Sequence, residues 1–474
     1  MIIKNFFKKI ELKYKSQHFS GLCFNSQECK KDNIFFAIKG TKIDGNKFIN
    51  HAIKKGAKII ISKQKFEGLK KNILFIKSTN VRKSLSEFAY TIYKDKPKNI
   101  IAVTGTNGKS SVADFYFQIL MLNKKKVASI GTLGIKTQNY TKKVSNTTID
   151  PVALSICLNK LKKEKINDVI LEASSHGLKQ NRLDGLKFRT GIFTNLSHDH
   201  LDYHKTHSDY LKSKLYLFEK LLLKNANIVT DLEIPEYTKI KKIAIKEKFN
   251  IETISNKTGN LKIISHRYDN EKQIVKIRYN KNIYKFETKL IGKIQIKNIL
   301  MAMIAATKSG LNFKKIVDKI SNIKPVSGRL EQIGVIKNNS KVILDYAHTP
   351  EALKATLKSL KKQFENRKIS IVFGCGGNRD KIKRSMMGKE MADASSFEET
   401  FPGLPCLGFY AGGEIGPMAK ADNNNVFQQG QAALQGFTVV FGVFVVPIPT
   451  DTKHMRLDDS PENCLNHMRR KFMK

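Results

Sequence analysis

Residues 100–111 of this 474-residue chain read Ile-Ile-Ala-Val-Thr-Gly-Thr-Asn-Gly-Lys-Ser-Ser, and this stretch decides the fold. An apolar run breaks into a glycine loop that a lysine and two hydroxyls close. Glycines let backbone N–H groups point at phosphate oxygens, the lysine reaches the β/γ-phosphates, and the first serine can hold Mg²⁺. The loop predicts a bound nucleoside triphosphate, and the residues predicted to contact it are Gly105, Thr106, Asn107, Gly108, Lys109, Ser110 and Ser111.

The surroundings of the loop favour a βαβ unit. A helix-compatible run from 111 to 122 follows it, and Val127 to Ile130 offers the next strand. The spacing between the two glycines is two residues shorter than in the usual phosphate loop. The alternative is therefore an ordinary glycine turn before an amphipathic helix.

Composition narrows the class of protein. The formal charge is +44, but the lysines are spread along the chain in no long basic block, so we expect no nucleic-acid partner. Six scattered cysteines without a C-x-x-C pair indicate neither a zinc knuckle nor a dense disulfide frame, and a reducing cytoplasm fits them. The N-terminus lacks the pattern of a signal peptide, and the apolar run at 437–446 is too short to span a bilayer, so no membrane partner is expected.

The chain divides into segments. Residues 1–97 alternate short apolar runs with Gly and Asp turns, which predicts a small α/β domain. Residues 98–324 form a central segment with the phosphate loop, and residues 325–394 contain the strand-to-loop transitions of a Rossmann-like domain.

Polar residues in the central segment follow predicted strands. Glu172 ends the strand that begins at Asp168, where a parallel sheet would place a Mg²⁺ ligand. The stretch 195–204 holds three histidines and two aspartates, which favours a metal or phosphate role. A zinc hydrolase using His198, His200 and His204 is the competing interpretation. Lys214 lies on a helical pattern, where a lysine is most often a snorkelling side chain.

Several of these motifs together resemble the Mur ligase family. They are residues 104–111, Asn146-Thr147-Thr148, Glu172-x-Ser-Ser-His176, Thr194-Asn195-Leu196, Asp199-His200-Leu201-Asp202-Tyr203-His204 and Tyr210-x-x-x-Lys214. More narrowly, the chain is similar to the tripeptide synthetase branch over residues 20 to 394. The resemblance implies a three-domain α/β architecture with a central phosphate-loop domain built on a parallel sheet.

The resemblance also implies roles for individual residues. Lys109, Glu172, His200 and Lys214 would be catalytic, and Mg²⁺ would be held by Ser110, Glu172, His200 and a carbamylated Lys214. ATP would also meet Asn298, Arg329 and Asp345. Substrate-binding residues would be Ser26 and Thr41 for the UDP-sugar, Asn146, Thr147, Thr148, Ser174, Gln180 and Arg182 for the muramoyl-peptide, and Arg379 for the incoming diamino acid.

Two departures from the family pattern stand out. On the adenine side, Ile294 and Gln295 replace a Phe and an Asn. From 395 onward the family's continuation is missing, including the motif that selects the amino acid. The tail 395–474 has 7 Lys and Arg against 8 Asp and Glu, carries 6 of the 11 prolines, and resembles the C-terminal part of FIST sensory domains over residues 401–417. A fused or mis-joined reading frame is the favoured explanation, and the third domain is then incomplete. The alternative is a genuine but divergent third domain.

The expected activity is ATP-dependent ligation of a diamino acid, meso-diaminopimelate, to UDP-N-acetylmuramoyl-L-alanyl-D-glutamate. ATP and Mg²⁺ are the expected cofactors, UDP-muramoyl-dipeptide and a free diamino acid the partners, and a cytoplasmic monomer the expected form. The alternative is a catalytically inactive, Mur-like scaffold that binds substrate but whose truncated third domain no longer closes over ATP.

Overall fold

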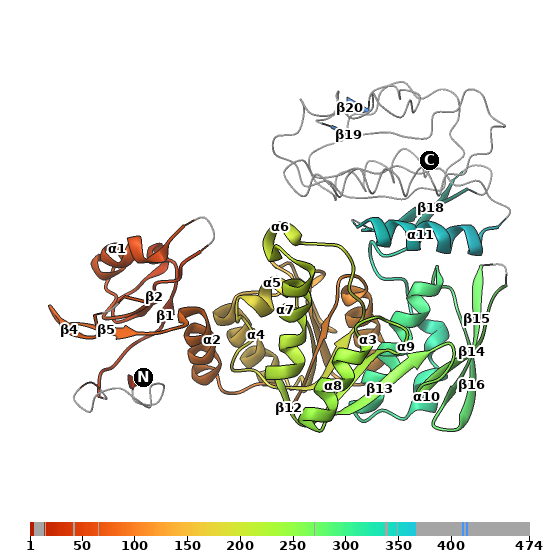
Figure 1. Ribbon diagram of the computed structural model, residues 1–474, viewed down its shortest axis with the longest axis horizontal. Coiled ribbons are helices and arrows are strands. Elements are labelled where there is room, and N and C mark those ends of the chain that lie inside the picture. The colour runs from red at the N-terminus through yellow and green to blue at the C-terminus, as the bar shows by residue number, and fades with distance from the viewer. Residues whose placement is uncertain are drawn as a thin grey trace.

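The computed structural model describes residues 1–3, 14, 16–40, 43–64, 66–269, 271–336, 340–347 and 349–365, together with the backbone of 410–411 and 414–415 (Figure 1). An N-terminal α/β unit, a large central α/β unit and the start of a third unit follow one another along the chain. The predicted Thr41 and Arg379 lie outside the described residues, as does most of the tail 395–474.

The N-terminal unit is a five-stranded sheet with the strand order β1-β2-β3-β5-β4. Its strands are parallel except for the antiparallel β4–β5 pair. Ile34 and Phe36 pack on one face of the sheet and Phe35 on the other, because successive side chains of a strand point to opposite sides. The elements are β1 (Leu22–Cys23), η3 (Ser26–Glu28), β2 (Ile34–Phe36), η4 (Gly45–Phe48), α1 (Ile49–Lys54), β3 (Ile59–Ser62), β4 (Gly68–Lys70), β5 (Ile73–Lys77) and α2 (Val81–Ile92).

The central sheet has eleven strands in the order β16-β15-β14-β13-β12-β11-β6-β10-β7-β8-β9. The strands from β14 to β7 are parallel, and antiparallel strands extend both edges. The strands are β6 (Asn99–Thr104), β7 (Val127–Gly131), β8 (Gly134–Lys136), β9 (Thr141–Lys142), β10 (Asp168–Glu172), β11 (Phe188–Phe193), β12 (Leu222–Asp231), β13 (Asn250–Ser255), β14 (Leu261–Asp269), β15 (Lys272–Tyr279) and β16 (Asn282–Thr288).

Helices cover both faces of this sheet. On β6, Ile101 and Val103 pack in one apolar cluster with α3 and α9, whereas Ile100 and Ala102 pack in a second cluster with α4 and α7. Burial of both faces is the reason β6 reads as a continuous apolar run rather than an alternating one. The helices are α3 (Lys109–Leu122), α4 (Pro151–Lys163), α5 (Ser175–Lys179), α6 (Leu201–His204), α7 (His207–Lys220), α8 (Tyr237–Glu247), α9 (Lys293–Lys308), α10 (Phe313–Val317) and η5 (Ile320–Asn322).

The third unit begins with an antiparallel hairpin of β17 (Glu331–Ile336) and β18 (Ser340–Leu344), followed by α11 (Pro350–Gln363). The strand predicted at 342–344 is part of β18. The strand and glycine turn predicted from 369 to 380 lie outside the described residues. In the tail, only the short antiparallel pair β19 (Tyr410–Ala411) and β20 (Glu414–Ile415) is described. No helix among the described residues has the length and apolar character needed to cross a membrane.

Candidate active site

The glycine loop connects β6 to α3, as the sequence predicts. Gly105 has a φ of +147° and Gly108 a φ of +86°, which side-chain-bearing residues rarely adopt. A Cβ at Gly105 would lie 1.9 Å from the Thr194 hydroxyl, and one at Gly108 would lie 2.6 Å from the Asn298 amide oxygen. Both glycines are therefore required by backbone shape and by close neighbours, as a phosphate loop would need.

The end of β11 holds the loop in place. The Thr106 and Asn107 N–H groups donate to the Asn195 backbone and side-chain oxygens at 2.9 Å each. The Thr194 hydroxyl donates to the Asn107 carbonyl at 2.6 Å. These bonds join residues that are about 90 positions apart, so the loop is preorganised by the sheet rather than by its own sequence.

Two lysines converge on the loop. Lys109 Nζ donates to the Gly105 and Thr106 carbonyls at 2.9 and 2.7 Å, and Lys214 Nζ donates to the same Gly105 carbonyl at 2.7 Å. Burial lowers the pKa of both lysines, and their mutual repulsion lowers the pKa of Lys214 further. Lys214 is 1% exposed. The snorkelling interpretation of Lys214 is therefore wrong, because α7 turns this side chain inward against the loop.

Glu172 lies at the end of β10 beside the loop, where the sequence predicts a Mg²⁺ ligand. Its carboxylate accepts hydrogen bonds from the Ser110 hydroxyl at 3.0 Å and from the Thr132 N–H at 2.9 Å. It is 2% exposed. A hydroxyl and a buried carboxylate in contact are hard oxygen donors of the kind that Mg²⁺ prefers, so Ser110 and Glu172 fit this ion. Sequence reasoning missed Thr132, which no motif marks.

A cluster of aromatic rings and histidines adjoins the two lysines. The ring of His200 lies 3.4 Å from the carboxylate of the buried Asp199 and packs edge-on against His176, with ring centroids 4.7 Å apart. Burial lowers the pKa of His200 to about 3, although Asp199 opposes the shift. His200 is therefore neutral at physiological pH and has a ring nitrogen lone pair available.

The zinc hydrolase interpretation finds no support in this cluster. Within the described part of the chain, no three His, Cys, Asp or Glu side chains are grouped as ligands of a metal ion. His204 is fully buried among Tyr203, Tyr210 and His176, and its pKa is lowered to about 4, first of all by burial.

Several of the predicted peptide-binding residues lie near the backbone carbonyl of Glu172. The Thr148 hydroxyl donates to the Glu172 carbonyl at 2.8 Å and also contacts Ser174, while Arg182 donates to the Thr148 carbonyl. The Thr147 hydroxyl lies 3.0 Å from that of Thr132. These residues thus form one network that begins at the candidate metal ligand.

A cavity of about 580 Å³ lies between the N-terminal and central units. Four predicted substrate-binding residues line it, namely Ser26, Asn146, Gln180 and Arg182. Sequence reasoning missed Arg82 on α2, which also lines the cavity. Burial lowers the pKa of Arg182, and the nearby charge of Arg82 lowers it further. Two guanidinium groups at one cavity favour an anionic ligand. No local pattern around Arg82 distinguishes it from a surface residue of a helix.

The predicted adenine-side residues lie near the start of the third unit. Asn298 is buried and donates to Gln295 at 3.1 Å, and Gln295 donates to the Arg329 carbonyl at 3.1 Å. Asp345 is buried, and its carboxylate accepts from the Leu330 N–H at 2.7 Å, so its oxygens serve the structure of this unit. Arg329 is close enough to Lys109 to lower the pKa of that lysine.

Comparisons with known proteins agree with this geometry. Three family models match: "Mur ligase family, catalytic domain" over residues 18–95, "Mur ligase middle domain" over 103–306, and "Mur ligase, glutamate ligase domain" over 328–400.

Relatives with assigned names include the UDP-N-acetylmuramoyl-L-alanyl-D-glutamate–2,6-diaminopimelate ligases of Rickettsia conorii and Zymomonas mobilis. The first is 38% identical over 381 residues, covering 79% of this chain and 78% of the relative. The second is 36% identical over 375 residues, covering 79% and 76%.

Solved structures with similar folds include a ligase of the same name. It has a TM-score of 0.68 and 28% identity, with coverage of 87% of this chain and 82% of that one. A MurF ligase from Thermotoga maritima in complex with ADP shares the fold at a TM-score of 0.56 and 17% identity, covering 78% of this chain and 81% of its own.

Proposed function

Because the chain belongs to the Mur ligase family, we propose that it is an ATP-dependent ligase that adds diaminopimelate to UDP-N-acetylmuramoyl-L-alanyl-D-glutamate in peptidoglycan precursor synthesis. The observation that carries the proposal is the meeting of Lys109, the Ser110–Glu172 pair and Lys214 at one glycine loop. The relative and the solved structure with the same name are both ligases, and this favours a ligase over the alternative of an inactive scaffold.

The chemistry has two balanced steps. An oxygen of the D-glutamate γ-carboxylate attacks the γ-phosphorus of ATP, and the bond between this phosphorus and the oxygen that bridges it to the β-phosphate breaks. ADP is released, and the γ-carboxylate has become an acyl phosphate. The free amine of diaminopimelate then attacks the acyl carbon, phosphate leaves, and the nitrogen loses a proton. In such transfers a protein contributes mainly charge neutralisation and positioning.

The chain's residues divide this work. Lys109 would hold the β/γ-phosphates, and the glycine loop would present its N–H groups to them. Mg²⁺ would supply positive charge at the transferred phosphoryl group, held by Ser110 and Glu172, with His200 beside them. Lys214 would join them as a carbamate. Its lowered pKa supports this role, because a neutral amine reacts with CO₂ and an ammonium does not.

The cavity between the first two units would bind the UDP-muramoyl-dipeptide. Ser26, Asn146, Gln180 and Arg182 line it, and its volume and two guanidinium groups suit a ligand with a diphosphate. We further propose that the protein works in the cytoplasm, where ATP is available, as a monomer without a nucleic-acid or membrane partner.

The test is replacement of the loop lysine. Lys109→Ala should abolish phosphate release in the presence of ATP, UDP-muramoyl-dipeptide and diaminopimelate, whereas Lys126→Ala, which removes an exposed lysine, should leave it unchanged. Calorimetry with UDP-muramoyl-dipeptide, run beside the ADP assay, separates the ligase from the inactive scaffold. Binding without turnover in the parent protein would establish the scaffold, and unchanged turnover in Lys109→Ala would refute the role of the loop.

A further inference from the structure

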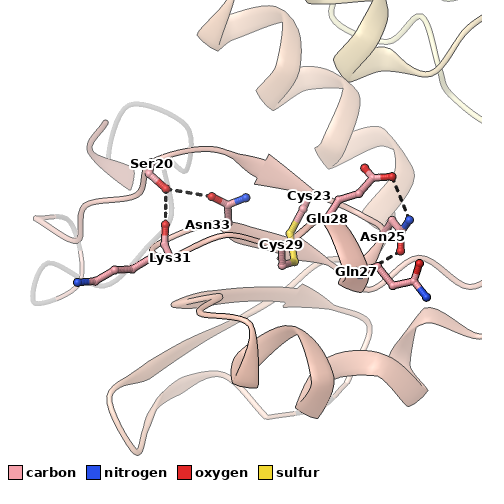
Figure 2. The surroundings of a disulfide bond; sticks show 8 residues. All are labelled: Ser20, Cys23, Asn25, Gln27, Glu28, Cys29, Lys31 and Asn33. Atoms are coloured by element: carbon pink, nitrogen blue, oxygen red, sulfur yellow. Dashed lines mark hydrogen bonds between the residues drawn. A yellow bond between two sulfur atoms is a disulfide. The ribbon is translucent and has the colours of Figure 1, made fainter.

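A disulfide joins Cys23 and Cys29 and closes the turn between them (Figure 2). Cys23 ends β1, and Cys29 directly follows η3. Four of the five residues between them line the 580 Å³ cavity: Phe24, Asn25, Ser26 and Gln27. The ring that the disulfide closes, residues 23–29, thus contains one wall of the cavity. The scattered cysteines of the sequence fit a reducing compartment, whereas the structure pairs two of them in a disulfide.

The enclosed turn is held by short-range hydrogen bonds. The Asn25 side chain accepts from the Gln27 N–H at 3.1 Å and donates to Glu28 at 3.0 Å, and the Glu28 N–H donates to the Asn25 carbonyl at 3.1 Å. β1 itself has two residues and, among the strands of the described residues, pairs with β2 alone at the edge of the sheet. Short edge elements open at low free-energy cost, so the disulfide is an important constraint on this turn.

We propose that Cys23–Cys29 is a thiol–disulfide switch that sets the affinity of the cavity for the UDP-muramoyl-dipeptide, an inference that rests on the proposed function. In the oxidised protein the seven-residue ring holds Phe24 to Gln27 in the shape of the cavity wall. In the reduced protein the turn samples more conformations. Binding then loses the conformational entropy of this turn, which weakens the affinity for the ligand.

The redox step is ordinary disulfide exchange with a dithiol reductant. A thiolate of the reductant attacks one sulfur, the Cys23–Cys29 bond breaks, and a mixed disulfide forms. The second thiol of the reductant then closes its own disulfide and releases the protein. Two electrons and two protons pass to Cys23 and Cys29, and a small disulfide reverses the reaction by giving up its own S–S bond.

Burial of the two sulfurs couples this chemistry to ligand binding. Cys23 and Cys29 are 4% and 6% exposed and pack with Phe35, Ala52 and Ile60. A reductant reaches them only when the turn opens, and a ligand against the turn opposes that opening. By linkage, the factor by which oxidation tightens binding equals the factor by which binding stabilises the disulfide.

The same burial keeps the reduced protein folded. Free cysteines behave as small apolar side chains, so both thiols remain suited to the cluster that surrounds them. Reduction is therefore expected to loosen one turn rather than unfold the N-terminal unit. Cys157 serves as the matched control, because its thiol is outside the cavity wall and burial raises its pKa to about 11.

The experiment measures the dissociation constant of UDP-muramoyl-dipeptide by calorimetry for oxidised and dithiothreitol-reduced protein. Oxidation should tighten binding by about 5-fold or more, the lower end of typical coupling between sites. The double variant Cys23→Ala/Cys29→Ala should bind weakly under both conditions, and Cys157→Ala should keep the full redox difference. Alkylation and mass spectrometry, run in dithiol redox buffers, should show that saturating ligand shifts the disulfide equilibrium by the same factor.

The outcomes are distinguishable. Equal affinity in the two redox states overturns the switch and leaves the proposed function standing. Alkylation of both Cys23 and Cys29 after treatment with an excess of a small disulfide does the same. Absence of binding in both states overturns the proposed function and the switch with it. Loss of the circular dichroism signal on reduction shows unfolding and overturns the local mechanism.

Discussion

Lys214→Met is expected to make the protein more stable and less active at once. The side chain is 1% exposed, and its burial together with Lys109 holds the pKa of the amine well below 10.5. Methionine keeps a long flexible side chain and removes the polar group. Burying a polar group such as an amine costs about 1–3 kcal/mol relative to an apolar one, and methionine removes that cost. The lost hydrogen bond to the Gly105 carbonyl costs about 1 kcal/mol, so the net gain is up to about 2 kcal/mol.

The sign of the pH dependence follows from the lowered pKa. Between the folded and the unfolded pKa of Lys214, the unfolded chain binds more protons, so stability falls as pH falls through that range. Lys214→Met removes this loss, and its stability gain over the parent should therefore be larger at pH 6 than at pH 9. Urea unfolding followed by intrinsic fluorescence at both pH values measures the difference.

Activity should move in the opposite direction. If Lys214 carries a carbamate that binds Mg²⁺, its loss should lower ATP-dependent turnover by at least about 10²-fold, as removal of one charge-stabilising group does in other enzymes. Lys212→Met, at an exposed position of the same helix, is the control and should change neither quantity. Lys214→Ala should regain part of its rate when a short-chain carboxylic acid is added. A Lys214→Met protein with parental turnover would refute the catalytic role, and one that is less stable than the parent would refute the burial argument.

Two further changes test other parts of the site. Gly131→Ala would place a Cβ 2.2 Å from the Glu172 carboxylate and displace it from Ser110, so turnover should fall by about 10²-fold, and parental turnover in phosphate-release assays would contradict the assigned geometry. The pKa of His204 is lowered to about 4 from its ordinary value of 6.5, so the unfolded chain binds more protons between these values and the protein loses stability as pH falls through them. His204→Phe should flatten that part of the curve of stability against pH. An unchanged curve in urea unfolding would count against this prediction.

The sequence alone determined the local parts of this protein. The apolar run 100–104 and the glycines after it specify a buried strand and a phosphate loop, because both features depend on neighbouring residues. Glu172 was predictable at a strand end for the same reason. The resemblance to a family then placed the motifs in one architecture, and the family comparisons agree with it.

Tertiary structure decided which of these pieces meet. Periodicity indicates a snorkelling lysine at position 214, yet the packing of α7 buries its amine against a carbonyl 109 residues away. Arg82 reaches the cavity of Arg182, and Cys23 pairs with Cys29, although no local pattern marks either. Helical and strand periods report only which face of an element is apolar. The contacts of a polar side chain depend on elements far along the chain, and these come together only when the sheet and its helices have packed.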